Sequence, residues 1–139
     1  MPILIAKTSD KAIDPNEVTK LVLDDKNGAD VTFVGRVRNH DSNKVVNKLI
    51  YEAHPEVDNQ ILKITQIIEK LFPEVNIATL HRVGELNVGD VAFVVAIASP
   101  HRDEALNCCR ALVESIKSNA PIWKNQYFSD GSNEWVNSP

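Results

Sequence analysis

The sequence predicts a single α+β domain with a mostly antiparallel sheet and three main helices. Segments with the apolar pattern of strands occur in pairs joined by short polar stretches, and helical segments separate the pairs. The length of 139 residues suits one domain with one substantial core. No repeat, low-complexity segment or linker divides residues 1–139, so we expect one continuous domain.

The first half of the chain begins with a short apolar strand, predicted over residues 2–6. A helix is predicted over residues 14–25, because Asp14 is a preferred N-cap residue and apolar residues follow it at helical spacing. Two strands are expected over residues 30–38 and 45–53. Only the polar stretch NHDSNK separates them, and so short a connection favours an antiparallel hairpin.

The second half begins with the clearest helix signal, a broad apolar stripe over residues 55–72. Residues 75–86 and 90–99 form a second predicted strand pair around the turn sequence NVGD. A third helix is predicted over residues 100–117, and the chain after it, which contains Gly131, is expected to be an irregular tail. The expected order is therefore β-α-β-β-α-β-β-α.

Bulk composition indicates an ordinary globular protein, with 43% hydrophobic and 24% charged residues. The formal net charge of −4 argues against a general nucleic-acid binder, which usually carries a basic excess. No apolar run approaches the roughly 18 residues of a membrane span, and the N-terminus lacks the long apolar region of a signal peptide. We therefore expect a cytoplasmic protein that binds neither nucleic acid nor membrane.

The sequence contains two cysteines, which are adjacent, Cys108 and Cys109. On a helix, neighbouring side chains point about 100° apart, so we expect no disulfide between them. The sequence shows no zinc-site spacing and no motif for a serine nucleophile, a phosphate-binding loop or a dinucleotide. We expect one or both cysteines in the core, and we predict no metal and no cofactor.

Cationic side chains recur beside turns and at the ends of predicted elements. His101 and Arg102 fall in the first turn of the third helix, where free backbone N–H groups also favour an anion. Arg36 and Arg38 share one face of a predicted strand, because side chains alternate along a strand. Such clusters in an acidic protein suggest an anionic ligand, although each group is also compatible with a solvated face. His81 is more simply a structural histidine.

The stretch IKSNAPIWKNQ combines features that rarely occur together. Lys117 and Lys124 bracket Pro121 and Trp123 where the third helix ends. A surface turn does not need the tryptophan, and a buried turn tolerates lysines poorly. A binding pocket with apolar walls and cationic contacts accommodates both. If the protein is an enzyme, its reactive group is a lysine or arrives with a partner or substrate.

Several stretches resemble one known family in their order and spacing. They are VTFVGRVRNH, LIYEAHPE, LHRVGELNVGD, ASPHRDEAL and IKSNAPIWKNQ. Together they extend from about Val31 to Trp135, and the block from Ser99 to Lys124 is the most specific part. On these motifs the sequence resembles the large, catalytic subunit of molybdopterin synthase.

The resemblance implies an α/β-hammerhead-type fold and a homodimer. In this family each dimer binds two small, ubiquitin-like sulfur-carrier subunits, which gives a heterotetramer. The C-terminal Gly-Gly thiocarboxylate of the carrier enters a pocket on the large subunit. There, two sulfurs are transferred to cyclic pyranopterin monophosphate to form the dithiolene of molybdopterin. The implied activity is thus a sulfurtransferase step of molybdenum cofactor biosynthesis.

The resemblance also assigns residues. Lys117 and Lys124 are the implied catalytic residues. The implied substrate-binding residues are Arg36, Val37, Arg38, His101, Arg102, Lys117, Lys124, Asn125 and Gln126. Either lysine has two open roles, as an acid–base group whose pKa is lowered by nearby cations or as a cation that stabilises charge on the attacked carbonyl. Family members commonly carry a basic and then an acidic residue where this chain has Asn125 and Gln126.

Helix geometry limits how one chain can form this site. His101 and Lys117 are sixteen positions apart, which on a continuous helix separates their backbones by roughly 24 Å. The resemblance assigns both ends to the active site, so we expect His101 and Arg102 of one chain to complete the pocket of another. Two alternatives stay open: a non-catalytic dimeric module that binds a phosphorylated metabolite, and an interaction protein whose groove near Trp123 captures an extended tail.

Overall fold

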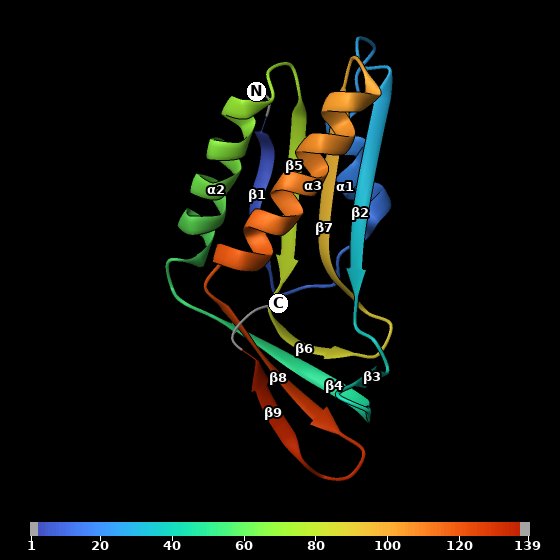
Figure 1. Cartoon of the computed structure of the whole chain (residues 1–139), viewed down its shortest axis with the longest axis vertical. Helices are drawn as coiled ribbons and strands as arrows, with labels where there is room; N and C mark the ends of the chain where they lie inside the picture. The colour runs from blue at the N-terminus through green and yellow to red at the C-terminus, as the bar shows by residue number, and fades with distance from the viewer. Residues whose placement is uncertain (1–2, 137–139) are drawn as a thin grey trace.

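The computed structural model describes residues 3–136, which form two sheets and three helices (Figure 1). In chain order the elements are β1 (Ile3–Ser9), α1 (Pro15–Val22), β2 (Ala29–Arg36), β3 (His40–Asp41), β4 (Lys44–Ala53), α2 (Val57–Leu71), β5 (Asn76–Arg82), β6 (Gly84–Asn87), β7 (Val91–Ser99), α3 (Arg102–Asn119), β8 (Ile122–Phe128) and β9 (Asn133–Val136). The predicted α+β class and the mostly antiparallel pairing are confirmed. Within this part of the chain, no helix is long and apolar enough to cross a membrane.

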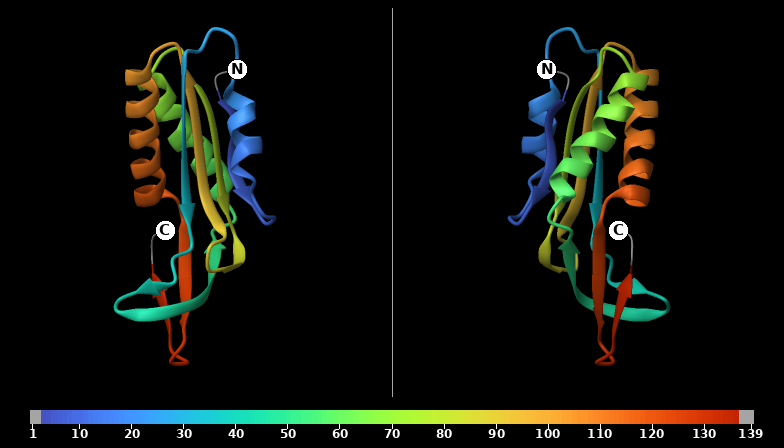
Figure 2. Two further views of the ribbon diagram at one scale, coloured as in Figure 1. Left: turned by 90° about the vertical axis from the view of Figure 1, so that its right-hand side faces the viewer. Right: turned by 90° about the vertical axis from the view of Figure 1, so that its left-hand side faces the viewer.

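The first sheet has the strand order β1-β5-β7-β2 and carries helices on both faces. β1 runs parallel to β5, whereas the β5–β7 and β7–β2 pairs are antiparallel. α1 lies on one face of the sheet, and α2 and α3 lie side by side on the other (Figure 2). Every residue of β7 from Ala92 to Ser99 is buried, as expected for a central strand that is covered on both faces.

Two apolar clusters fill the space between this sheet and its helices. The larger cluster packs α2 and α3 against the sheet and includes Ile61 and Leu112. The smaller cluster packs α1 against the opposite face and includes Val18 and Val94. The apolar stripe that predicted a helix over residues 55–72 is therefore the buried face of α2.

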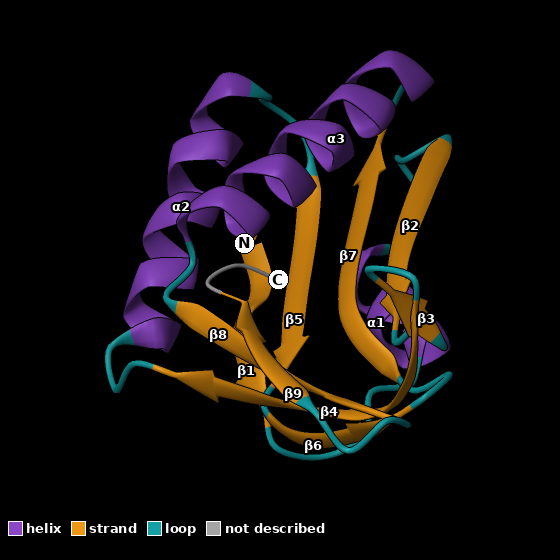
Figure 3. Ribbon diagram, turned by 60° about the horizontal axis from the view of Figure 1, so that its bottom comes forward, coloured by secondary structure: helices purple, strands orange, loops and turns teal. Residues whose placement is uncertain are grey.

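The second sheet lies across one end of the first (Figure 3). β4 organises it, because β3, β6 and β8 all pair antiparallel with β4. β9 adds to the other edge of β8. The sheet thus gathers segments that are far apart in the sequence at the end of the first sheet.

The start of α1 follows the sequence signal. The backbone of Asp14 is extended, and its Oδ1 accepts a hydrogen bond from the amide of Asn16 at 2.9 Å. Pro15 occupies the first helical position, where no amide donor is needed. The helix ends at Val22, earlier than predicted, because Leu23 turns to an extended conformation.

The predicted hairpin between residues 30–38 and 45–53 is wrong. β2 pairs with β7 in the first sheet, and its register shifts immediately before Arg36, where the chain leaves that sheet. The stretch NHDSNK forms a tight hairpin of its own between β3 and β4. At its turn, Ser42 and Asn43 have φ values of 52° and 62°, the left-handed geometry that a two-residue hairpin loop favours.

The strand predicted over residues 75–86 is divided between the two sheets. β5 ends at Arg82, and Gly84 adopts a φ of 94° that a residue with a side chain adopts only with strain. β6 then pairs with β4 instead of continuing along β7. The predicted antiparallel pairing with residues 90–99 is confirmed for β5.

The prediction of an irregular tail is wrong for residues 122–136, which form β8 and β9. Gly131, with a φ of 86°, lies in the turn between them. β8 lacks the usual strand pattern because Asn125 and Gln126 are both buried and polar. Their burial interrupts the alternation of apolar and polar residues by which a strand is recognised.

The packing of α3 is open to a direct test of stability. Leu112 is fully buried, whereas Leu106 of the same helix is 52% exposed. We predict that Leu112→Ala lowers the free energy of unfolding by about 3 kcal/mol, because it leaves a cavity beneath α3. The control Leu106→Ala is expected to cost under about 1 kcal/mol. Urea unfolding followed by circular dichroism measures both, and equal losses would contradict this packing.

Candidate active site

A pocket of about 290 Å³ lies where the two sheets meet, beside the C-terminal end of α3. Its lining residues are Gly35, Arg36, Arg38, Tyr51, His81, Ala92, Phe93, Lys117 and Lys124. They come from both sheets, from α3 and from the segment that follows β2. Two lysines and two arginines that the sequence indicated separately are thus brought to one place.

Lys117 and Lys124 lie on either side of a short, well-anchored connection. Lys117 belongs to the last turn of α3, and Lys124 belongs to β8. Between them, the amide of Ala120 donates to a carbonyl of the last helical turn at 2.9 Å. The carbonyl of Pro121 accepts a hydrogen bond from the amide of His54 at 3.1 Å, which ties the connection to the end of β4. These bonds fix the backbone between the two lysines.

The pKa of each of these lysines is lowered. For Lys117 the main cause is burial; the positive charges of Lys124 and Arg38 lower its pKa further, and the carboxylate of Glu114 opposes them. For Lys124 burial is again the main cause, although the carboxylate of Asp41 opposes it. Burial and like charges both disfavour an ammonium ion, so the pocket brings the lysines closer to neutrality at physiological pH.

Asp41 is a residue of this site that the sequence did not indicate. The amide Nε2 of Gln126 donates to Asp41 Oδ2 at 2.6 Å, and Arg38 Nη2 lies 3.7 Å from Asp41 Oδ1. The pKa of Asp41 is lowered, mainly by the hydrogen bond from Gln126 and with a contribution from the charge of Lys124. A carboxylate thus stands beside the cations of the pocket, placed there by the tight turn between β3 and β4.

His81 forms part of the pocket wall and is fully buried. Its Nδ1 lies 2.7 Å from the carbonyl oxygen of Arg82, and since a carbonyl only accepts, Nδ1 carries the proton. Burial lowers the pKa of His81 to about 4, and the charge of Lys117 contributes in the same direction. The ring is therefore neutral at pH 7. Its Nε2 keeps a lone pair that no group among residues 3–136 engages.

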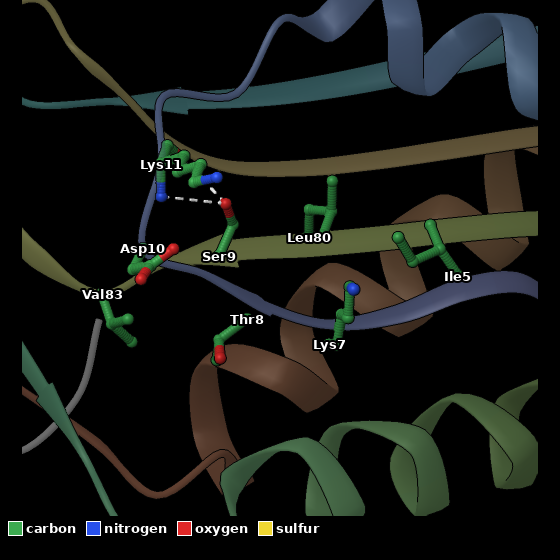
Figure 4. A pocket seen from close by; sticks show the side chains of 8 residues that line it. All are labelled: Ile5, Lys7, Thr8, Ser9, Asp10, Lys11, Leu80 and Val83. Atoms are coloured by element: carbon green, nitrogen blue, oxygen red, sulfur yellow. Dashed lines mark hydrogen bonds between the residues drawn. The ribbon is translucent and has the colours of Figure 1, made fainter.

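A larger hollow of about 580 Å³ lies along β1, but it does not gather the predicted residues (Figure 4). Its polar lining comes mainly from β1 and the loop after it, including Thr8 and Ser9. Lys7 and Lys11 are both exposed there, and Ser9 Oγ accepts a hydrogen bond from the amide of Lys11 at 3.1 Å. Size alone therefore does not select the site, and the convergence of cations favours the smaller pocket.

Comparison with known proteins decides the family. Residues 8–119 match the family model described as MoaE protein. The chain belongs to the MoaE protein family. A molybdopterin synthase catalytic subunit from a Nostoc species is 40% identical to it over 122 residues, covering 86% of this chain and 74% of that protein. The family resemblance of the sequence motifs is thereby confirmed.

Solved structures of similar proteins share the fold. The crystal structure of molybdopterin synthase from Staphylococcus aureus has a TM-score of 0.88 at 28% identity, covering 94% of this chain and 96% of that chain. A Helicobacter pylori structure, a protein–protein complex of subunits 1 and 2 of molybdopterin-converting factor, has a TM-score of 0.69 at 22% identity. It covers 98% of this chain and 90% of that chain, and it supports the fold alone.

In this member of the MoaE family, His101 and Arg102 do not line the pocket. Both are exposed at the opposite end of α3 from Lys117. His101 is the N-cap residue but makes no capping hydrogen bond through its side chain, and its carbonyl accepts a hydrogen bond from the hydroxyl of Ser99. One chain alone therefore does not bring the two ends of the helix together.

The three remaining predicted substrate-binding residues do not line the pocket, and all three are buried. Val37 is buried, and its backbone bonds to the β6–β7 turn through Gly89 and Asp90 at 2.8 and 3.0 Å. Asn125 is buried within the second sheet, where Nδ2 donates to the hydroxyl of Tyr127 at 3.2 Å. Gln126 reaches the site through its hydrogen bond to the Asp41 carboxylate described above.

The expectation that the cysteines are core residues is confirmed. Cys108 and Cys109 are both buried as free thiols. Burial raises the pKa of Cys108 to about 12 and that of Cys109 to about 11. Both sulfurs are therefore protonated at neutral pH and are poor nucleophiles.

The role of the Asp41 charge leads to a prediction about Lys124. Since this carboxylate raises the pKa of Lys124, Asp41→Asn should lower it further, and a titration of the lysine Nζ by NMR measures the change. Asp41→Asn combined with Gln126→Glu should restore the pKa, because a negative charge returns to the same hydrogen-bonded pair. The control is Asp130→Asn, which removes a carboxylate paired with Lys44 elsewhere. No downward shift in Asp41→Asn would contradict this assignment.

Proposed function

We propose that the chain is the large subunit of a molybdopterin synthase. It transfers sulfur from the C-terminal thiocarboxylate of a small carrier protein to cyclic pyranopterin monophosphate. The observation that carries the proposal is that Lys117, Lys124 and Arg38 converge on one pocket, whose lining among the described residues contains no thiol. Such a pocket suits a reaction in which the sulfur arrives on a partner and the substrate carries a phosphate. Membership of the MoaE family supplies the reaction class.

The surroundings of the two lysines favour different roles for them. Lys124 has two carboxylates that favour its charged form, Asp41 and Glu134, so it is suited to stabilise negative charge on the attacked carbonyl. The largest charge effect on Lys117 is instead the repulsion from Lys124, which one carboxylate, that of Glu114, opposes. A lowered pKa makes its amine a better proton acceptor near neutral pH. We therefore assign proton transfer to Lys117 and charge stabilisation to Lys124.

The other groups of the pocket fit a phosphorylated pterin. Arg36 and Arg38 provide guanidinium groups, which match the geometry of a phosphate. The neutral ring of His81 offers its Nε2 lone pair to a donor of the substrate. The rings of Tyr51 and Phe93 flank this histidine at centroid distances of 4.9 and 5.2 Å and supply an apolar wall.

Substitution by arginine separates the two lysine roles, because arginine keeps the charge but does not release a proton near neutral pH. We predict that Lys117→Ala and Lys117→Arg both slow molybdopterin formation by about 100-fold or more. Lys124→Arg should retain about a tenth or more of the rate, since its charge persists. The assay is single-turnover conversion of cyclic pyranopterin monophosphate with a thiocarboxylated carrier. Lys63→Ala, an exposed lysine of α2, is the control.

Two results would count against these assignments. If Lys117→Arg is as active as Lys124→Arg, proton transfer by Lys117 is wrong while the sulfur-transfer function stands. If folded Lys117→Ala and Lys124→Ala proteins both form molybdopterin at the wild-type rate, the proposed function itself is wrong.

The proposal includes two kinds of protein partner in the cytoplasm. One is the small, ubiquitin-like carrier whose Gly-Gly tail enters the pocket, consistent with the two-subunit complex of the Helicobacter pylori protein. The other is a second copy of this chain, giving a heterotetramer with two carriers. α3 is continuous over 18 residues, so its two ends lie roughly 27 Å apart. His101 and Arg102 therefore serve the pocket of the other copy.

Mixed dimers test this shared site. In a dimer of one Arg102→Ala chain and one Lys117→Ala chain, one site lacks both residues and the other has the full set. Two inactive proteins should therefore regain about half of the wild-type activity per mixed dimer. Mixing Lys117→Ala with Lys124→Ala is the matched control. Both residues belong to the same pocket, so every site stays incomplete and no recovery is expected. Verified Arg102/Lys117 mixed dimers without recovery would contradict the shared site.

A further inference from the structure

Arg82 is a buried arginine without an anionic partner. It is only 9% exposed at the end of β5. Its Nη2 makes one long hydrogen bond, 3.5 Å to the carbonyl of Glu85, and its buried Nε has no acceptor among residues 3–136. No carboxylate in this part of the chain lies within ion-pair distance of it. A buried guanidinium with so few partners is costly, because its lost hydration is not replaced.

A second pocket of about 290 Å³ lies at this arginine. We call it the Arg82 pocket, and its lining residues are Ala12, Ile13, Arg36, Arg82, Gly89, Asp90 and Val91. It lies on the α1 face of the first sheet, since Ile13 and Val91 belong to the cluster beneath α1. The candidate active site lies on the other face, where Phe93 belongs to the cluster beneath α2 and α3.

Alternation along β5 explains how neighbouring residues reach different pockets. Successive side chains of a strand point to opposite faces of the sheet. His81 therefore points into the candidate active site, and Arg82 points into the Arg82 pocket. Arg36, at the end of β2, contributes to the lining of both. The dipeptide that the sequence shows as one cationic pair is thus divided between two sites.

The Arg82 pocket contains many hydrogen-bond donors and few acceptors. Arg36 makes a single long bond, from Nη1 to the carbonyl of Gly89 at 3.4 Å. The carboxylate of Asp90 also lines the pocket, but its Oδ2 already accepts from the amide of Asn87 at 2.8 Å. Within residues 3–136 neither arginine forms an ion pair with it. Two guanidinium forks therefore have most of their N–H groups available to a ligand.

We propose that the Arg82 pocket binds a tetrahedral oxyanion of the phosphate type. Guanidinium groups bind such ions through paired N–H···O bonds, and the volume accommodates a phosphate group together with part of the molecule that carries it. The oxyanion provides the acceptors that Arg82 lacks in the protein. This site goes beyond the proposed sulfur transfer, which uses the opposite face of the sheet and assigns no role to Arg82.

Inorganic phosphate is the probe, and NMR of the backbone amides locates where it binds. At constant ionic strength, we expect saturable shifts of the Gly89, Asp90 and Val91 amides at phosphate concentrations of about 10 mM or below. Arg82→Met should weaken the binding reported by these amides about tenfold or more, because it removes charge-assisted bonds while nearly preserving volume. Arg110→Met, an exposed arginine of α3 outside this pocket, is the control and should leave the affinity unchanged.

A second variant and a second measurement distinguish this pocket from the candidate active site and from simple misfolding. Arg82→Lys keeps the charge but loses the fork, and it should also weaken phosphate binding. The thermal midpoint of the wild-type protein should rise with phosphate relative to chloride, and part of that rise should vanish in Arg82→Met. Lys124→Ala should leave the shifts at Gly89, Asp90 and Val91 intact, since Lys124 does not line this pocket.

Three outcomes overturn the proposal. They are no saturable shift of these amides, shifts confined to the neighbourhood of Lys117 and Lys124, or unchanged affinity in both Arg82 variants. Neither carrier protein nor pterin is needed for the measurement. Failure here would therefore leave the sulfur-transfer function untouched, and failure of that function would not remove a phosphate site at Arg82.

Discussion

The pairing of β4 with β8 is the interaction on which the candidate active site depends. It places Tyr51 opposite Lys124 and Leu49 opposite Gln126. Because β4 also holds β3, the same strand brings Asp41 within reach of Gln126. Removing this pairing would leave Lys124 on an unattached segment and the pocket without one of its walls. The backbone hydrogen bonds of one strand pair thus decide whether the charged groups meet.

The cations gathered by this pairing create an electrostatic strain that an anionic ligand relieves. Burial is the main cause that lowers the pKa of Lys117 and of Lys124, and the charge of Arg38 lowers both further. The pKa values of the lysines are lower in the folded chain than in the unfolded chain. At a pH between the folded and unfolded values, the unfolded chain therefore binds more protons. Stability therefore rises with pH through that interval. A bound phosphate or carboxylate would supply negative charge beside these buried cations. Its binding would therefore offset the free energy that it costs to bury the cations close together.

Local patterns in the sequence predicted local structure well. The N-cap at Asp14 and the apolar stripe of α2 depend on residues two to four positions apart, and both are confirmed. The segment from Lys117 to Lys124 was also singled out by the sequence, because its proline and tryptophan are unusual beside two lysines, and both lysines line one pocket. The α+β class follows from the same local signals.

Contacts between distant segments were not predictable in the same way. Asp41 and Gln126 are 85 positions apart, and nothing near either residue indicates the other. β8 escaped recognition because its buried positions hold amides whose partners belong to β9 and β3. The hairpin predicted across NHDSNK failed because the short turn at Ser42 and Asn43 was locally sufficient to reverse the chain. Which sheet each strand then joined was decided by tertiary pairing alone.

The pair His81 and Arg82 shows why chemical type alone is a poor guide to site membership. Both side chains are buried and carry ring or guanidinium nitrogens, and the two residues are neighbours in sequence. Because successive side chains of β5 point to opposite faces of the sheet, they nevertheless reach different pockets. His81 is neutral mainly because burial lowers its pKa, with a smaller contribution from the charge of Lys117, whereas an arginine stays charged in any pocket. Only Arg36 contributes to both linings, so its substitution would disturb both sites together. A substitution of Arg82 would disturb the Arg82 pocket alone, because the sheet lies between Arg82 and the two lysines, Lys117 and Lys124.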